Sequence, residues 1–173
     1  LTQMAHDHIS TMSPRGMSAY WTLVSKLLNQ RSNRPSNQLQ MQMKQILAYT
    51  LKDITTFGYR DLAQTSISFA KIINKVQKRK RNHYGTTEQI LQDVLIGKGS
   101  KIKQFIFTEI TKASTPILHE FDARHLSNLI YSFGLVEEVV PVEDGSTYFD
   151  MLAEVASPNL HTFNEQDLSN MLW

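Results

Sequence analysis

Four short segments of this chain align with one another without gaps, and such a repeat limits the possible folds more than any other sequence feature. The segments read MSPRGMSAYWTLVSKLL from Met12, FGYRDLAQTSISFAKII from Phe57, FDARHLSNLIYSFGLVE from Phe121 and FNEQDLSNMLW from Phe163. Their first residues lie 45, 64 and 42 positions apart. Repetition at this spacing is typical of arrays built from one helical unit.

The aligned columns predict that each segment begins a helix. The second column holds residues that favour a helix N-cap, namely Ser13, Gly58, Asp122 and Asn164. The first and sixth columns are apolar, as in a hydrophobic staple around a cap. Apolar residues then continue at helical intervals. Aromatic residues on this stripe are expected in the core: Tyr20, Trp21, Phe69, Phe133 and Trp173.

A second helix is expected before each of the last three segments, over residues 39–55, 101–113 and 147–156. A helical hairpin cannot cover its own apolar faces, so the pairs are expected to stack. The predicted fold class is therefore all-α, an α-solenoid of stacked antiparallel helix pairs. The approximate units are residues 1–30, 39–77, 101–136 and 147–173.

The 64-residue interval is too long for one unit, and the excess falls within residues 78–100. This insertion opens with the basic run Lys78-Arg79-Lys80-Arg81 and continues with TEQILQDVLIG, a short helix expected to end at Gly97. The insertion is expected to project from the stack.

Charge is distributed unevenly along the chain. Residues 1–112 contain 17 Lys and Arg against 6 Asp and Glu, whereas residues 113–173 contain one against 10, which together give the net charge of +2. The basic part is suited to a polyanion and the acidic part to another protein. Because the chain starts at Leu1 and ends at Trp173, it is expected to be a fragment, and its missing parts are an alternative source of charge balance.

Two groups of cations are candidate RNA contacts. Arg15, Arg60 and Arg124 fall at or next to the second helical position in three successive units, which predicts a ladder along the stack. The second group extends from one helix into the insertion: Lys71, Lys75, Lys78, Arg79, Lys80 and Arg81, with Lys98, Lys101 and Lys103 nearby in sequence. The alternatives are carboxylate partners in neighbouring units for the arginines, and a solvated loop or targeting signal for the basic run.

FNEQDLSNMLW and FDARHLSNLIYSFG resemble the second helix of octotricopeptide-like repeats and of the related FAST-kinase-like and heptatricopeptide repeats. Asn128 and Asn170 match the asparagine of that pattern, whereas Ala19 and Gln64 depart from it. Both asparagines are expected to bond backbone between helices in preference to reading bases. The resemblance implies an RNA-binding protein of mitochondria or plastids, acting in RNA stability, processing, translation or ribosome assembly. Ribosomal or other organellar proteins are possible partners of the acidic half.

No residue constellation predicts catalysis. Gly97-Lys98-Gly99-Ser100 lacks the earlier glycine of a phosphate-binding loop, since Gln92 stands there. His6 and His8 lack a third ligand at metal-binding spacing, and the chain has no cysteine. No apolar stretch approaches the roughly 20 residues of a membrane helix. The prediction is a non-catalytic RNA-binding protein with no cofactor, metal site or membrane contact; the alternative is a protein scaffold or a structural subunit of an organellar ribosome or other assembly.

Overall fold

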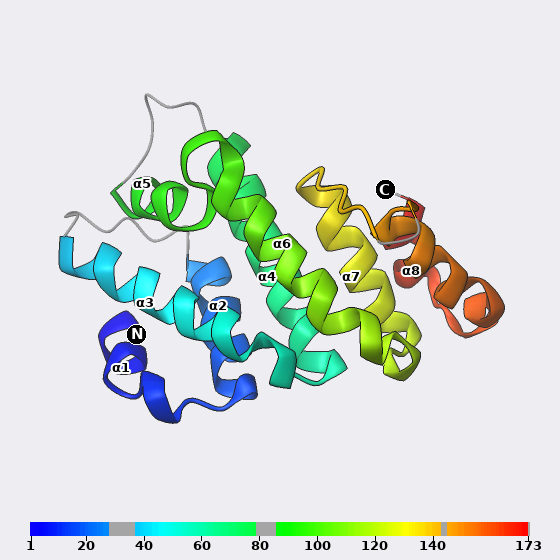
Figure 1. Cartoon of the computed structure of the whole chain (residues 1–173), viewed down its shortest axis with the longest axis horizontal. Helices are drawn as coiled ribbons and strands as arrows, with labels where there is room; N and C mark the ends of the chain where they lie inside the picture. Colours follow the sequence, from blue (N-terminus) through cyan, green and yellow to red (C-terminus); the bar gives the residue numbers. More distant parts are fainter. Residues whose placement is uncertain (28–36, 79–85, 143–144, 173) are drawn as a thin grey trace.

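The computed structural model describes residues 1–27, 37–78, 86–142 and 145–172, and the all-α prediction is confirmed for this part of the chain. An isolated β-bridge joins Pro141 and Thr147. The α-helices of the described ranges, shown in Figure 1, are α1 (Thr2–Asp7), α2 (Pro14–Leu27), α3 (Asn37–Asp53), α4 (Tyr59–Lys78), α5 (Thr86–Leu91), α6 (Lys101–Ser114), α7 (Ala123–Leu135), α8 (Tyr148–Ala156) and α9 (Glu165–Leu172).

The four repeated segments begin α2, α4, α7 and α9, and α3, α6 and α8 correspond to the helices predicted before the last three. α1, which precedes the first segment, was not predicted from the sequence. The division of the chain into four units and an insertion stays a prediction, since helix bounds alone do not define a unit.

Each repeated segment enters its helix along the same backbone path. A short 3-10 turn precedes it, and the first residue of the segment donates its N–H to the carbonyl three residues earlier, at 3.4, 3.2, 3.2 and 3.1 Å in chain order. That residue is extended, with ψ between 125° and 134°: Met12, Phe57, Phe121 and Phe163. The turn directs the aromatic side chain inward before the helix starts, and Phe57, Phe121 and Phe163 are buried.

The predicted N-caps form wherever the side chain has an oxygen. Asp122 Oδ1 accepts from the backbone N–H of His125 at 2.9 Å, and Asn164 Oδ1 accepts from that of Asp167 at 2.9 Å. Ser13 Oγ accepts from Gly16 N–H at 3.2 Å. In all four segments the carbonyl of the cap residue accepts from the sixth-column N–H at about 3.0 Å, and at Gly58 this is the cap residue's contribution without a side chain.

α2, α4, α7 and α9 pack against one another in chain order. They run parallel, because residues at similar distances from their N-termini meet across each interface. Hydroxyl contacts link the neighbours: Thr22 with Ser68 at 3.2 Å, Ser66 with Ser132 at 2.6 Å, and Ser127 with Asp167 at 3.3 Å. The N-termini of the four helices therefore lie along one edge of the molecule.

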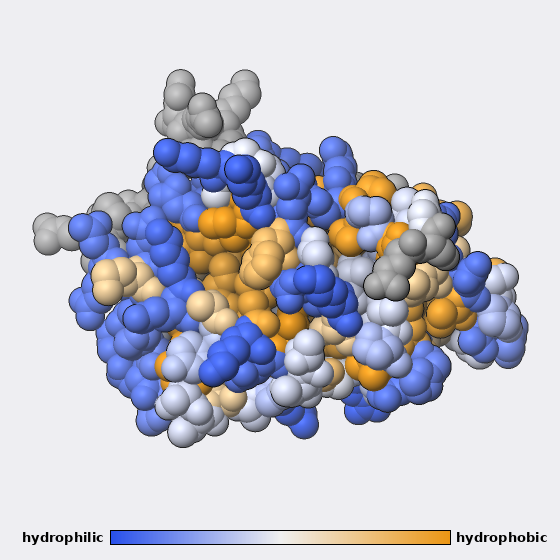
Figure 2. All heavy atoms as spheres, in the orientation of Figure 1, coloured by the Kyte–Doolittle hydropathy of each residue, from blue (hydrophilic) through white to orange (hydrophobic). Residues whose placement is uncertain are grey.

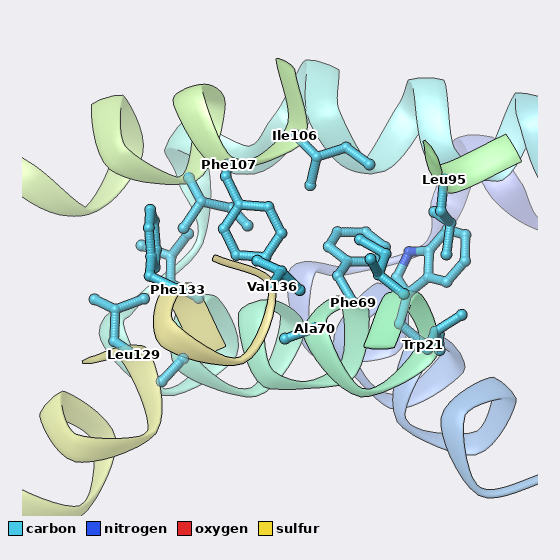
Figure 3. Close-up of a cluster of buried hydrophobic side chains, with 14 of the residues drawn as sticks. Trp21, Phe69, Ala70, Leu95, Ile106, Phe107, Leu129, Phe133 and Val136 are labelled. Carbon is cyan, nitrogen blue, oxygen red and sulfur yellow. The ribbon is translucent and has the colours of Figure 1, made fainter. Parts of the chain in front are cut away.

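The core lies between these helices and a second layer that includes α3 and α6, and α6 crosses in front of α4 in Figure 1. Trp21 of α2 contacts Phe69 of α4 with ring centroids 4.8 Å apart, and Phe107 of α6 contacts Phe133 of α7 at the same distance (Figure 3). Trp21 Nε1 donates to Thr50 Oγ1 at 2.9 Å. The predicted core position is confirmed for the described aromatics of the stripe; Trp173 lies outside the described residues.

The expectation that the insertion projects from the stack is wrong for its described part. α5 and the single π-helical turn after it (Gln92–Ile96) contact α3, α4 and α6. Their apolar residues are buried: Ile90, Leu91, Val94, Leu95 and Ile96. The helix ends at Gly97 as predicted, at φ 67°, where an added Cβ would lie 2.7 Å from Ile102. This segment buries too many apolar side chains to remain in solvent, so it fills the space between α3 and α6.

Within the described ranges, no helix joins the length and the apolar character that crossing a bilayer requires. α4, at 20 residues the longest of them, is buried in its middle and carries exposed charged side chains toward both ends.

Trp21→Ala is expected to lower the free energy of unfolding by about 3–5 kcal/mol, because it opens a cavity between α2 and α4 and removes the indole donor from Thr50. The control is Leu23→Ala on the same helix, where the side chain is exposed; its effect is expected to stay within about 0.5 kcal/mol. Urea denaturation followed by circular dichroism measures both. Equal losses for the two variants would contradict this account of the core.

Candidate nucleic-acid interface

α2, α4 and α7 each carry an arginine as their second residue: Arg15, Arg60 and Arg124. Because the three helices are parallel neighbours, the arginines follow one another along the edge where the N-termini lie. Packed helices are typically about 8–10 Å apart, which sets the approximate step of the row. The helix N-termini add partial positive charge to the same edge. In α9 the equivalent residue is Gln166, so the row of charges ends at α7.

All three arginine side chains are exposed. Arg15 and Arg124 form no ion pair with any described residue. Arg60 Nε donates to Tyr59 Oη at 2.9 Å, and its guanidinium carbon lies 5.4 Å from the centroid of that ring. Among the described residues, no carboxylate of a neighbouring unit forms an ion pair with these arginines, although the charge of Arg60 acts on Asp122.

Polar side chains form a stripe on one face of α4, and the stripe is interrupted in the middle of the helix, where Ile67 and Ser68 are buried. A helix turns once every ~3.6 residues, so the following side chains share one face: Arg60, Gln64, Lys71, Lys75 and Lys78. The opposite face, with Phe69, Ile73 and Val76, lies in the core. Arg60 and Lys78 are separated by about 27 Å along the axis. The lysines thus share a face, as predicted, but most of the helix lies between them and the arginine row.

The other cations named in the sequence analysis differ in how exposed they are to solvent. Lys98 and Lys101 are exposed, whereas Arg79, Lys80 and Arg81 lie outside the described residues. Lys103 is buried: its Nζ lies 2.9 Å from Glu138 Oε2 and donates to the Val136 carbonyl at 2.8 Å. This lysine joins α6 to the end of α7, so its position near the basic run in the sequence does not make it an exposed cation.

The two family-pattern asparagines do not bond backbone between helices as expected. Asn170 Oδ1 accepts from Gln166 Nε2 at 3.0 Å within α9. Asn128 is partly exposed on α7, and its side chain has no hydrogen-bond partner among the residues described.

A cleft of about 610 Å³ opens beside Arg124, between the N-terminal ends of α7 and α9. Its other lining residues were not predicted as functional. The sequence signal for this cleft is the third column of the repeat, which holds a large side chain in one segment, Tyr59, and a small one in another, Ala123. A small residue there leaves a cleft only if two helices pack side by side at that position, and one segment alone does not show which helices are neighbours.

Asp122, the N-cap of α7, also lines this cleft. The positive charge of Arg60 acts on its carboxylate. Desolvation by partial burial would raise the pKa of Asp122. Opposing it are the backbone N–H of His125, the His125 ring 2.6 Å away, and the charges of His125 and Arg60. Together they hold the pKa of this carboxyl below its usual value of 3.8.

Asp122→Asn is expected to remove a pH-dependent part of the stability, since asparagine keeps a capping oxygen but not the charge. A lowered folded-state pKa means that the carboxylate stabilises the fold above its unfolded-state pKa of ~3.9, and that this contribution disappears as pH falls through the folded-state pKa. The wild-type advantage in free energy of unfolding, measured in urea at a series of pH values, should therefore shrink below about pH 4. A difference that is constant from neutral to acid pH would refute the assignment.

The candidate interface thus consists of the row Arg15, Arg60 and Arg124, the basic stripe of α4 and the adjoining cleft. This sequence matches no protein-family model, no curated protein and no solved structure.

Proposed function

We propose that this chain is an RNA-binding helical-repeat protein, an α-solenoid of stacked antiparallel helix pairs that takes part without catalysis in organellar RNA metabolism. The observation that carries the proposal is the position of Arg15, Arg60 and Arg124, which is the same in three parallel neighbouring helices. Exposed cations at a regular step suit an extended polyanion better than a compact ligand, because each can neutralise a different phosphate.

A second group of cations lies toward the other end of α4, and the buried middle of the helix separates it from the arginine row. Lys71 and Lys78 are exposed, and Arg79, Lys80 and Arg81 follow directly in the chain. Gln64 and Asn128 lie at equivalent positions of α4 and α7 and present polar groups close to the arginine row. RNA recognition by repeats combines such backbone neutralisation with polar contacts to unpaired bases. The proposed partner is therefore RNA, single-stranded or structured with accessible single-stranded parts.

The proposed site of action, a mitochondrion or plastid, rests on the resemblance of the blocks at Phe121 and Phe163 to octotricopeptide-like repeats. So do the processes assigned to the protein: RNA stability, processing, translation or ribosome assembly.

A second candidate function is that of a protein scaffold or a structural subunit of an organellar assembly. Figure 2 shows a hydrophobic depression on the face where α3 and α6 lie, and apolar side chains of these helices are exposed: Met41, Tyr49 and Phe105. Exposed apolar area of this kind marks contact surfaces in other proteins. It lies on the layer opposite the basic stripe, so a protein could occupy one face while RNA occupies the other.

The test is the salt dependence of binding to a mixed-sequence single-stranded RNA oligonucleotide, measured by fluorescence anisotropy. The logarithm of the binding constant should fall linearly with the logarithm of the salt concentration, with a slope of about −0.7 per neutralised phosphate. Arg15→Ala, Arg60→Ala and Arg124→Ala should each flatten the slope by about 0.7. Changing Lys78, Arg79, Lys80 and Arg81 together to Ala should flatten it further if the basic run contacts phosphate.

Lys44→Ala is the matched control, because Lys44 is an exposed cation on α3, in the other layer. It should leave the slope unchanged. The arginine row would be excluded as the phosphate contact if Lys44→Ala changed the slope as much as the arginine variants do. Absence of any salt-dependent RNA binding would refute the proposed function and favour the scaffold.

A further inference from the structure

The third column of the repeat decides how much space remains between neighbouring helices at the arginine edge. In α4 this column holds Tyr59, whose ring reaches toward the next unit. Its centroid lies 5.8 Å from that of Phe121 and 5.3 Å from that of His125. Tyr59 therefore fills the space between the N-terminal ends of α4 and α7.

In α7 the same column holds Ala123, which has no side chain beyond Cβ. The counterparts of Phe121 and His125 in the next unit are Phe163 and Asp167, and Ala123 cannot reach them as Tyr59 reaches its neighbours. The space that a tyrosine ring fills in one interface is thus open in the next. This is the cleft of about 610 Å³, a volume within the range of small-molecule sites.

Apolar side chains, exposed polar groups and one buried carboxylate together line this cleft. Phe121, Leu126 and Phe163 line the apolar part. The polar part includes the exposed guanidinium of Arg124 and the carboxylate of Asp167, which is only 4% exposed. A flat ring that enters such a cleft would bury its faces against apolar surface and direct its edge toward the polar groups.

The Asp167 carboxylate can accept further hydrogen bonds. Oδ1 accepts from Ser127 Oγ at 3.3 Å, and Oδ2 accepts from the Asn164 backbone N–H at 3.2 Å. A carboxylate offers about four acceptor positions, so each oxygen retains capacity. Because it only accepts, it favours a ring edge rich in N–H donors and disfavours one that presents carbonyl oxygens.

We propose that the cleft between α7 and α9 receives one unstacked nucleobase of a bound RNA, with a preference for guanine. Guanine presents neighbouring N1–H and N2–H donors on its Watson–Crick edge, whereas uracil presents one N–H between two carbonyls. Unstacked bases are recognised in RNA-binding proteins by ring burial together with hydrogen bonds to this edge. Arg124, at the mouth, lies where the flanking phosphate of the same strand would run. This inference rests on the proposed RNA binding and names a position on the strand where that binding depends on sequence.

The test compares oligouridine tracts that carry one central guanosine, adenosine, cytidine or uridine, with affinities measured by fluorescence anisotropy. The wild-type protein should bind the guanosine tract about tenfold more tightly than the all-uridine tract. Ala123→Tyr places in α7 the residue that fills the equivalent space at α4. It should remove the preference while the salt slope stays as in the wild type.

Two further variants keep the test decisive. Ala153→Tyr adds the same ring at an exposed position of α8, outside the cleft, and should retain the preference. Asp167→Asn has nearly the same shape but replaces an acceptor oxygen by a donor nitrogen, so it should reduce the guanosine preference and leave the all-uridine affinity unchanged. If Ala123→Tyr does not fold, which thermal melting would show, Asp167→Asn alone decides the case.

The outcomes separate the two proposals. If no tract binds, RNA binding itself is refuted. If the tracts bind with a normal salt slope but equal affinity, or if the preference survives in both Ala123→Tyr and Asp167→Asn, the base site is refuted and RNA binding stands. An oligoarginine peptide tests whether the cleft instead receives a cationic side chain of a partner protein. Binding of this peptide that Ala123→Tyr abolishes, without any base preference, would assign the cleft to a cationic side chain of a partner protein.

Discussion

The structure depends on the two-sided packing of α4. This helix contacts α2 on one side and α7 on the other, and its inner face, with Phe69 and Ile73 fully buried, packs under the second layer. The middle of the helix, from Thr65 to Ala70, is buried on all sides, and its exposed polar side chains lie toward the two ends. Apolar burial on this scale fixes the rotation of the helix about its axis. Because that rotation is fixed, Arg60 at one end of the helix and Lys78 at the other face outward.

Because the four helices stack in parallel, exposed residues in the same column of the repeat become neighbours on the surface. The 3-10 turn and the extended first-column residue place all four helix starts in the same way, and the helices then meet at matching heights. Side chains that occupy one column are consequently neighbours in space, although 45 or 64 residues of sequence separate them. Arg15, Arg60 and Arg124 become a row by this rule, and Tyr59 and Ala123 become alternative fillings of one kind of space.

The second layer is less regular than the first, and additional elements and contacts fill the spaces between its helices. α5 and the π-helical turn occupy the space between α3 and α6. Farther along, the buried Lys103–Glu138 pair joins α6 to the segment after α7. Lys103 also donates to the Val136 carbonyl, and a buried charge needs such additional partners to offset its desolvation.

The sequence by itself determined the repeated helices and their partners, although not α1, together with three caps and the inward aromatic stripe, because these follow from residue type and periodicity within one segment. Three of the four cap positions were correct down to the capping oxygen, at Ser13, Asp122 and Asn164. Only the tertiary structure decided what each surface residue faces. It placed Lys103 in a buried ion pair, packed the apolar residues of the described part of the insertion into the core and left a cleft at Ala123. Each of these outcomes depends on the distance between helices that are far apart in the sequence. That distance is set by the close packing of whole helices against one another, and the periodicity of a single segment does not encode it.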